Sequence, residues 1–279
     1  MGIRIVTDST CDLPAETVNR YGIEVIPLHI TLGEETLIDG VNITREEFYH
    51  RLPDHDPAPS SAAPGPDTFI QSYEALVEQG ATDILSLHIS ESLSTTVNSA
   101  RIGAKQFTRI PVTVVDSGQL SLGLGFLVER AAIFAEAGLE MSEIVAKLHE
   151  IMPRTYVFAA LDTLEYLRRS GRMHVAVARF GEILRLKPLL FMNQGNATAH
   201  RVRTRQKALA RLHEWLEKLS PFEQLAVVHA GVPSRAEELR EQACRFLPSG
   251  KLLVIQITPV LGANLGVGAL GFAGIAKEK

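Results

Sequence analysis

Three short hydroxyl-rich segments each follow a predicted strand and precede a predicted helix. They are Asp8-Ser9-Thr10, residues 90–96 and Asp116-Ser117-Gly118. In open α/β sheets, ligands bind beyond the carboxyl ends of the strands, close to helix N-termini. Free backbone N–H groups and the helix dipole favour an anion there. Helix capping by these Ser, Thr and Asp side chains is the simpler interpretation of any one segment. Together with Ser60-Ser61, the three segments favour an oxyanion site.

A glycine-rich segment near the C-terminus is a second candidate for function. A buried strand predicted over residues 252–257 leads into a glycine-rich loop, and four glycines stand within residues 262–271. Glycine at this density is costly in conformational entropy. It indicates close approach of the backbone to a ligand or to another strand. A plain turn between two strands, with bulges, is the alternative.

Familiar catalytic motifs are missing. The chain has no GxxxxGK[ST] and no GxSxG, and the spacing of Gly262 to Gly268 differs from the dinucleotide fingerprint. His88 lies within an apolar strand and is expected to be a core histidine, whereas His229 ends a strand and stays open to either role. A hydrolase or phosphotransferase using Ser, Asp and His at these loops is the alternative function. The lack of a nucleotide motif and of an adjacent Ser/His pair counts against it.

Composition and charge exclude further classes. The chain has 279 residues, 46% hydrophobic and 22% charged, which is typical of a globular protein of one or two domains. A net charge of −4 gives no basic field to hold nucleic acid. Cys11 and Cys244 belong to no Cys/His cluster, so no metal site and no cofactor are predicted.

Location follows from the same features. Two cysteines predict no disulfide framework and fit a reducing cytoplasm, where we expect the protein to reside. The N-terminus leads straight into a strand with no apolar signal-peptide region. No uninterrupted apolar run reaches the length of a membrane span.

The first half of the chain alternates strands with helices. Strands are predicted over residues 3–6, 23–28, 84–89 and 112–115, and helices over residues 14–21, 97–107 and 119–136. Such alternation indicates a parallel sheet with helices on its faces. We therefore predict an α/β fold whose N-terminal domain, residues 1–150, contains a parallel sheet.

Residues 53–67 interrupt this alternation. Their five prolines exclude a helix and a central strand. A linker is one interpretation. The other is a functional loop, because loops of this length inside a domain often carry function.

The second half changes character near Ala137-Gly138. Helices are predicted over residues 141–151, 162–169, 207–219 and 234–244, with one more after Arg172. Strands are predicted over residues 155–160, 184–192, 198–202 and 224–229. Residues 193–196 carry a hairpin signal between two of these strands. We therefore predict a second, mixed α/β domain over residues 151–279.

The order of these segments resembles that of the DegV family of bacterial fatty-acid-binding proteins. Residues 7–13 resemble the family's opening, 59–64 its P-x-T-S-Q-P loop, 89–96 its I-S-S-x-L-S-G-T segment, 163–172 its T-L-x-Y-L-x-x-G-G-R segment, and 259–269 its P-V-x-G-x-H-x-G-P-G-A loop. Asp116-Ser117 and Lys187-Pro188 follow at the expected places. The resemblance covers essentially the whole chain.

The resemblance implies a non-catalytic carrier in phospholipid synthesis. Its ligand would be one long-chain fatty acid buried between two α/β domains, and its partner a separate ATP-dependent fatty acid kinase. Transient contact with a membrane surface is compatible with that role. Ser61 stands at the carboxylate-binding Thr of the family, Ser94 at the carboxylate-binding Ser, and Arg172 at the arginine tied to the site and to kinase docking. On local grounds alone, Arg172 and its neighbours would form a solvated basic face.

The expected ligand-binding set is wider than these three residues. It comprises Ser9, Ser60, Ser61, Ser94, Thr95, Arg172 and Asn264. Asn264 replaces the family histidine that lies near the ligand head group and is tied to kinase-dependent phosphorylation. Ala62-Ala63 replaces Ser-Gln, and Thr95, Gly65 and Val267 also depart from the family pattern. Lipid binding is compatible with these changes, whereas Asn264 puts the kinase partnership in question.

Overall fold

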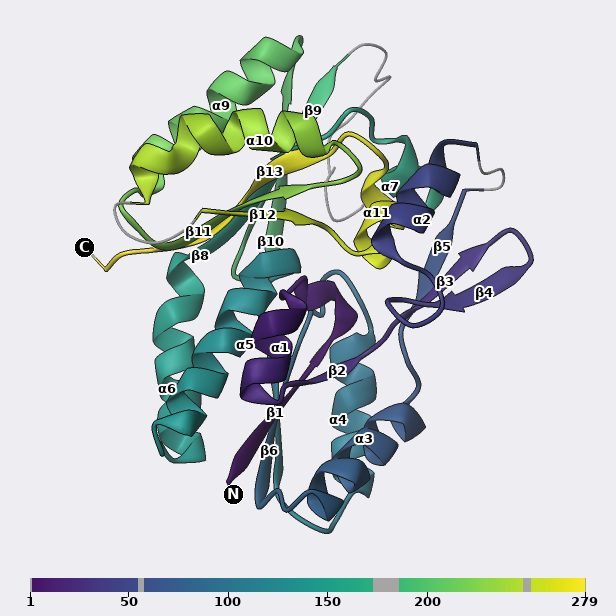
Figure 1. Cartoon of the computed structure of the whole chain (residues 1–279), viewed down its shortest axis with the longest axis vertical. Helices are drawn as coiled ribbons and strands as arrows, with labels where there is room; N and C mark the ends of the chain where they lie inside the picture. The colour runs from purple at the N-terminus through teal and green to yellow at the C-terminus, as the bar shows by residue number, and fades with distance from the viewer. Residues whose placement is uncertain (1, 55–57, 173–185, 248–251, 279) are drawn as a thin grey trace.

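The computed structural model describes residues 2–54, 58–172, 186–247 and 252–278. Two β-sheets dominate the fold, one in the lower and one in the upper half of Figure 1. The fold class is α/β, as predicted. The division of the chain after residue 150 stays a prediction.

The lower sheet is entirely parallel, as predicted. Its strands are β1 (Ile3–Asp8), β2 (Glu24–Ile26), β6 (Asp83–His88) and β7 (Val112–Asp116), in the order β2-β1-β6-β7. The helices of this half include α1 (Ala15–Tyr21), α3 (Pro66–Glu78) and α4 (Thr96–Gln106). Phe69 and Tyr73 of α3 pack with Val6 and Ile84 of the sheet. A parallel sheet places the ends of β1, β6 and β7 at one edge, so their hydroxyl-rich loops lie side by side.

A small antiparallel sheet was not predicted. It contains β3 (His29–Leu32), β4 (Glu35–Ile38) and β5 (Ser60–Ala62), in the order β4-β3-β5. The alternating burial of His29-Ile30-Thr31-Leu32, followed by Gly33 with φ +62°, is the hairpin signal. Helix α2 (Arg45–Arg51) and the 3-10 turn η2 (Leu52–Asp54) follow, and α2 begins with a capping box between Thr44 and Glu47.

The upper sheet is mixed, as predicted for the second half of the chain. Its strands are β8 (Thr155–Ala160), β9 (Lys187–Asn193), β10 (Asn196–Val202), β11 (Phe222–His229), β12 (Leu253–Gln256) and β13 (Leu270–Ala276). They lie in the order β10-β9-β8-β13-β11-β12, and only β11 and β12 run parallel to each other. Helices α9 (Arg205–Leu219) and α10 (Pro233–Ala243) cover one face (Figure 1). Short 3-10 turns, η3 (Met152–Arg154) and η4 (Cys244–Phe246), precede β8 and follow α10.

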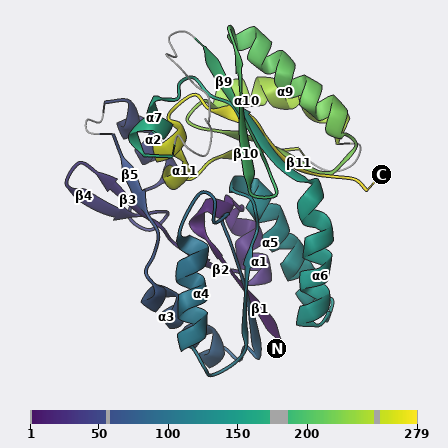
Figure 2. The same ribbon diagram turned by 180° about the vertical axis from the view of Figure 1, so that it is seen from behind.

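The predicted hairpin between β9 and β10 is confirmed, and it also reaches the lower half of the molecule. Its two-residue turn is Gln194-Gly195, both with positive φ. The backbone N–H of Gly195 donates to the carbonyl oxygen of Gly118, 2.9 Å away, in the loop after β7. Figure 2 shows this hairpin from behind.

Helix α5 (Ser121–Glu136) lies between the sheets and α6 (Met141–Ile151) packs beside it. Ten residues of α5 are buried, because this helix packs against β1 and β6 below and against β8, β11 and β13 above. A helix that is apolar on all sides is expected to be buried in this way.

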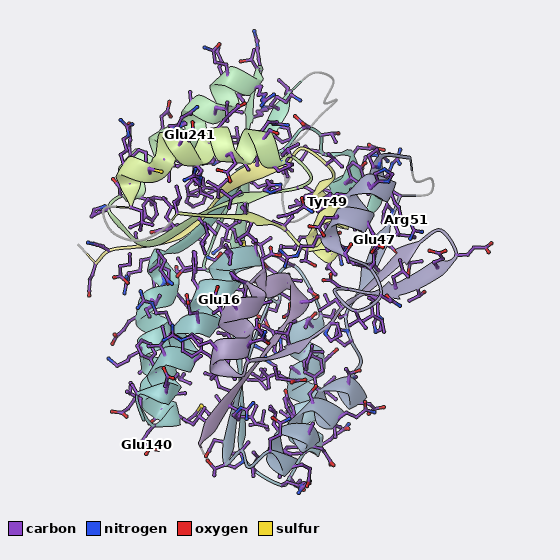
Figure 3. All side chains as sticks on the ribbon, viewed as in Figure 1. Glu16, Glu47, Tyr49, Arg51, Glu140 and Glu241 are labelled. Atoms are coloured by element: carbon purple, nitrogen blue, oxygen red, sulfur yellow. The ribbon has the colours of Figure 1, made fainter. Side chains whose placement is uncertain are left out.

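For the glycine-rich segment near the C-terminus, the predicted loop was wrong, whereas the predicted close approach of its backbone to another strand is confirmed. The predicted glycine-rich loop is in large part a helix, α11 (Pro259–Leu265), with Pro259 at its first position. Gly262 lets α11 pack against Phe48 and Tyr49 of α2, since a Cβ at Gly262 would collide with both rings (Tyr49 is labelled in Figure 3). The apolar run that follows is the central strand β13, where Gly271 closely approaches Ala159 of β8.

The proline-rich segment and the following region differ from expectation as well. Pro66 starts helix α3, where the missing N–H is tolerated, so proline did not exclude a helix there. Residues 60–62, by contrast, form an edge strand, so the predicted exclusion of a central strand is confirmed. Helix α7 (Glu165–Arg169) is shorter than the predicted 162–169. The helix predicted after Arg172 lies outside the described residues.

Candidate functional site

An apolar cavity lies between the lower half of the molecule and the upper sheet. It contains about 930 Å³ of space not filled by protein atoms, part of it open to solvent. Leu28, Ile89 and Leu120 line it from the lower half, and Leu190 and Met192 line it from β9. Helix α11 closes one side through Val260, Leu261 and Leu265. The wall is therefore suited to a long hydrocarbon rather than to a polar metabolite.

Four polar side chains interrupt this apolar wall: Ser61, Ser94, Arg172 and Asn264. The Nη1 of Arg172 donates to Oδ1 of Asn264 over 2.9 Å, and Nδ2 of Asn264 lies 3.4 Å from Oγ of Ser61. The Nε of Arg172 donates to the carbonyl oxygen of Leu93, which precedes Ser94, over 3.4 Å. Four of the seven predicted site residues thus meet at one place, although they come from β5, the loop before α4, the turn after α7, and α11.

The electrostatic feature of this polar group is the charge of Arg172. Its hydrogen-bond partners among the described residues are neutral, namely Leu93 O, Ser170 O and Asn264 Oδ1. No Asp or Glu lines the described cavity. Burial lowers the pKa of this guanidinium below its usual value, yet arginine stays charged at physiological pH. A half-buried cation that has no carboxylate partner in the described part of the chain favours an anionic ligand.

Ser94 lies at the N-terminus of α4. Its Oγ is 2.8 Å from Oγ1 of Thr96 and accepts a hydrogen bond from the Thr96 N–H over 3.3 Å. The α4 dipole adds partial positive charge at this end of the helix. Ser94 and Arg172 thus approach the polar end of the cavity from different elements, and both favour a negative group.

The comparisons with known proteins agree with one family over the whole chain. The sequence model of a family described as "Uncharacterised protein, DegV family" matches residues 2–277. A DegV domain-containing protein of Streptomyces coelicolor is 38% identical over 274 residues, which cover 96% of each chain. This chain belongs to the DegV family.

Solved structures of the DegV family share the fold. One, titled as showing fatty acid binding of a DegV family protein from Thermus thermophilus, is 32% identical with a TM-score of 0.86, covering 99% of this chain and 100% of the other. A stearic acid-binding protein from Eubacterium ventriosum is 26% identical, also with a TM-score of 0.86, covering 99% and 98%.

Three predicted residues of this DegV chain do not line the cavity. Ser60 is exposed, because neighbouring residues of strand β5 point to opposite faces and Ser61 takes the inner one. Thr95 is exposed at the N-cap of α4. The Oγ of Ser9 accepts from the Leu28 N–H over 3.2 Å and belongs to a different cavity.

That other cavity adjoins a buried polar junction that sequence reasoning missed. Asp12 accepts hydrogen bonds from the Thr258 N–H (2.7 Å) and from Ser121 Oγ (2.6 Å), and it lies 3.3 Å from Arg45 Nη2. Asp39 accepts from the hydroxyl of Thr258. The junction ties the turn η1 (Ser9–Cys11) to the starts of α5 and α11. The left-handed conformation of Asp12 (φ 55°) could not be inferred from a single sequence.

A Ser-His-Asp array exists in the lower half, contrary to the expectation that no adjacent Ser/His pair is present. Ser86 and His88 share one face of β6, with Oγ 2.6 Å from Nε2, and His88 Nδ1 lies 3.0 Å from Asp8 Oδ2. All three residues have no exposed surface, and Tyr73 hydroxyl covers Ser86 at 2.8 Å. A substrate cannot reach this serine, so the array serves the core, as expected for His88.

The described residues contain no group of three or more His, Cys, Asp or Glu side chains that could hold a metal ion. Among them, no helix is both long enough and apolar enough to cross a membrane.

The buried Asp12 generates a prediction about pH. Burial raises the pKa of Asp12 to about 6, whereas an unfolded chain has a value of about 3.9. The folded state therefore binds the carboxyl proton of Asp12 more tightly than the unfolded state does. This tighter binding stabilises the folded state fully below about pH 4, and the stabilisation is lost as pH rises through 6. Relative to Asp12→Asn, the wild type should lose on the order of 2–3 kcal/mol of unfolding free energy between pH 4 and 7.

Urea denaturation of both proteins across this range measures the difference. His229 acts in the opposite direction, because burial lowers its pKa to about 4, but it is common to both proteins and cancels. Parallel pH profiles would show that Asp12 is not protonated in the folded state near pH 5.

Proposed function

We propose that this chain binds one long-chain fatty acid in the cavity between its two halves and acts as a carrier rather than as a catalyst. The observation that carries the proposal is an apolar cavity whose one lining charge, among the described residues, is the cation of Arg172. A fatty acid matches both features, because it joins a hydrocarbon chain to a single carboxylate. The fatty-acid-binding DegV relatives support the same assignment.

The energetics assign different roles to the two ends of the ligand. Each buried methylene contributes about 0.8 kcal/mol, so a chain of about fifteen contributes on the order of 12 kcal/mol before the costs of binding. The carboxylate needs hydrogen bonds that offset its desolvation. Hydroxyls of Ser61 and Ser94 and the guanidinium of Arg172 are suited to supply them.

The first test is the content of the purified protein. We expect native mass spectra to exceed denaturing mass spectra by the mass of one long-chain fatty acid, because the apolar wall retains the ligand through purification. Extraction with organic solvent should release that acid for identification. Protein that is purified empty, and that also fails to bind added palmitate or oleate after delipidation, would contradict the proposal.

The second test concerns the head group. Losing one hydrogen bond to a charged group costs about 1.5–3 kcal/mol, so Ser61→Ala and Ser94→Ala should each weaken binding by about ten- to a hundredfold. Arg172→Gln should weaken it at least as much, because it also removes the charge.

The sequence neighbours of Ser61 and Ser94 provide matched controls. Ser60→Ala and Thr95→Ala make the same kind of truncation one residue away but outside the cavity, so they should leave the dissociation constant within about twofold. Equal effects of the cavity variants and their neighbours would place the carboxylate elsewhere. Melting temperatures of the delipidated variants separate binding effects from unfolding.

We further propose that the bound acid is presented to an ATP-dependent fatty acid kinase, with Asn264 limiting that step. Both ends of the Asn264 amide are engaged, since Oδ1 accepts from Arg172 and Nδ2 donates to Val260 O at 2.8 Å. Asparagine orients its neighbours but cannot carry a proton near neutral pH, as a histidine can. A location in the cytoplasm and contact with a membrane surface stay predictions.

The third test uses a bacterial fatty acid kinase, ATP and the loaded protein. Asn264→His should increase acyl-phosphate formation, while fatty acid affinity changes little between pH 6 and 8. A wild type that turns over as fast as a histidine-containing relative, with no gain in the variant, would show that the asparagine is a neutral replacement.

A further inference from the structure

A second large cavity, separate from the apolar one, lies where the two halves of the molecule meet. It contains about 1110 Å³ of space not filled by protein atoms, part of it open to solvent. The turn η1, helix α1 and the loop between β4 and α2 line it from the lower half, and Ile255 and Thr258 line it from the upper half. No described residue lines both this cavity and the apolar cavity around Arg172.

Two buried carboxylates line this second cavity and meet at Thr258. Asp12 accepts a hydrogen bond from the Thr258 N–H over 2.7 Å, and Asp39 accepts one from the Thr258 hydroxyl. Only 1% of Asp12 and 5% of Asp39 is exposed. Because both negative charges are held close to one residue with little solvent around them, each disfavours the ionisation of the other.

One guanidinium compensates these two charges only in part. Arg45 Nη2 lies 3.3 Å from Asp12 Oδ1, and Arg45 Nη1 donates to the carbonyl oxygen of Gln256. Asp39 forms no salt bridge within the described part of the chain. Two carboxylates and one guanidinium are the charged groups of the described lining, which leaves one negative charge.

The pKa values of the two carboxyls agree with this imbalance. Burial raises the pKa of Asp39 above its usual value and that of Asp12 to about 6. Such shifts are expected where neighbouring groups stabilise a carboxylate incompletely. A cation that enters the cavity would stabilise both ionised side chains.

The walls around the carboxylates are largely apolar. Leu13, Val18 and Val25 line the cavity, as does Val41. Val41 is 69% exposed, and it is one of two large hydrophobic side chains that are exposed among the described residues. Apolar walls that lead to an acidic group match a ligand that joins a short hydrocarbon body to a cationic head.

We propose that this cavity is a second binding site, which takes a small organic ammonium ion with a short apolar body. An ammonium group is compact and has three donors, so it can reach both carboxylates near Thr258 and supply the positive charge that the described lining lacks. An anion would add a third negative charge, and a neutral hydroxyl would leave the imbalance in place. The site is independent of the proposed fatty acid function.

Titration with pentylammonium chloride at about pH 7.5, followed by amide NMR, tests the proposal. The signals that shift should cluster within residues 9–19 and 39–45, with the same dissociation constant before and after delipidation, because the two cavities share no described residue. 1-Pentanol has the same hydrocarbon body without the charge. It should bind at least about tenfold more weakly, since it makes no charge-assisted hydrogen bond.

Three variants separate charge from space. Asp39→Asn keeps an oxygen for the Thr258 hydroxyl but removes the charge, so it should weaken pentylammonium binding by about tenfold or more and change pentanol binding less than about twofold. Glu16→Gln is the matched control, because Glu16 (labelled in Figure 3) is exposed on α1 and does not line the cavity. It should leave both dissociation constants within about twofold. Val18→Phe fills the cavity and should weaken both probes, which also tests the site if Asp39→Asn does not fold.

Equal affinities for pentylammonium and pentanol would overturn the proposal. Wild-type ammonium binding by both Asp39→Asn and Val18→Phe would do the same, as would shifts confined to residues of the apolar cavity. None of these results bears on fatty acid binding, which the content of the purified protein tests separately.

Discussion

The burial of helix α5 is the constraint on which the rest of the structure depends. The helix contacts both sheets at once, and two glycines make this possible. A Cβ at Gly123 would lie 2.6 Å from the Val157 side chain of β8, and one at Gly125 would collide with the Cys11 carbonyl oxygen below. Because α5 sets the distance between the halves, it also sets the width of the space that they leave. Leu120, directly before α5, lines that space.

Within that space, the apolar wall and the polar group around Arg172 are suited to different parts of ligand binding, namely affinity and orientation. For the fatty acid that we propose as ligand, the hydrocarbon wall would account for most of the favourable free energy, but it cannot orient the ligand. In the proposed complex, orientation is the role of Arg172, whose charge is compensated by no carboxylate among the described residues. A built-in Asp or Glu partner would neutralise this charge and weaken the attraction of the site for an anion. The described residues instead give the guanidinium three neutral acceptors, which hold its position without neutralising its charge.

Sequence reasoning predicted the parallel sheet, the mixed sheet and the β9–β10 hairpin because each depends on local periodicity and turn chemistry. It also predicted Ser61, Ser94, Arg172 and Asn264, which the structure brings together. It could not separate Ser61 from Ser60, because which face of β5 points inward depends on its pairing with β3, and that strand was not predicted. Ser9 was misplaced for a similar reason: the tight turn at Asp12 directs it to another cavity. The glycines of residues 262–271 suggested a loop, whereas the one glycine within α11, Gly262, allows that helix to pack against two aromatic rings.

The Ser86-His88-Asp8 array shows why accessibility has to be weighed together with geometry. Its distances would suit a nucleophile and its base. Its burial between two strands instead makes it a set of satisfied polar groups that fixes the ends of β1 and β6, because Asp8 also accepts from the Ile89 and Thr10 N–H groups. The loop that follows β6 carries Ser94. A catalytic-looking cluster therefore stabilises the strand ends from which the loop with Ser94 begins, and this division between a rigid polar core and an accessible polar end is suited to the carrier function that we propose.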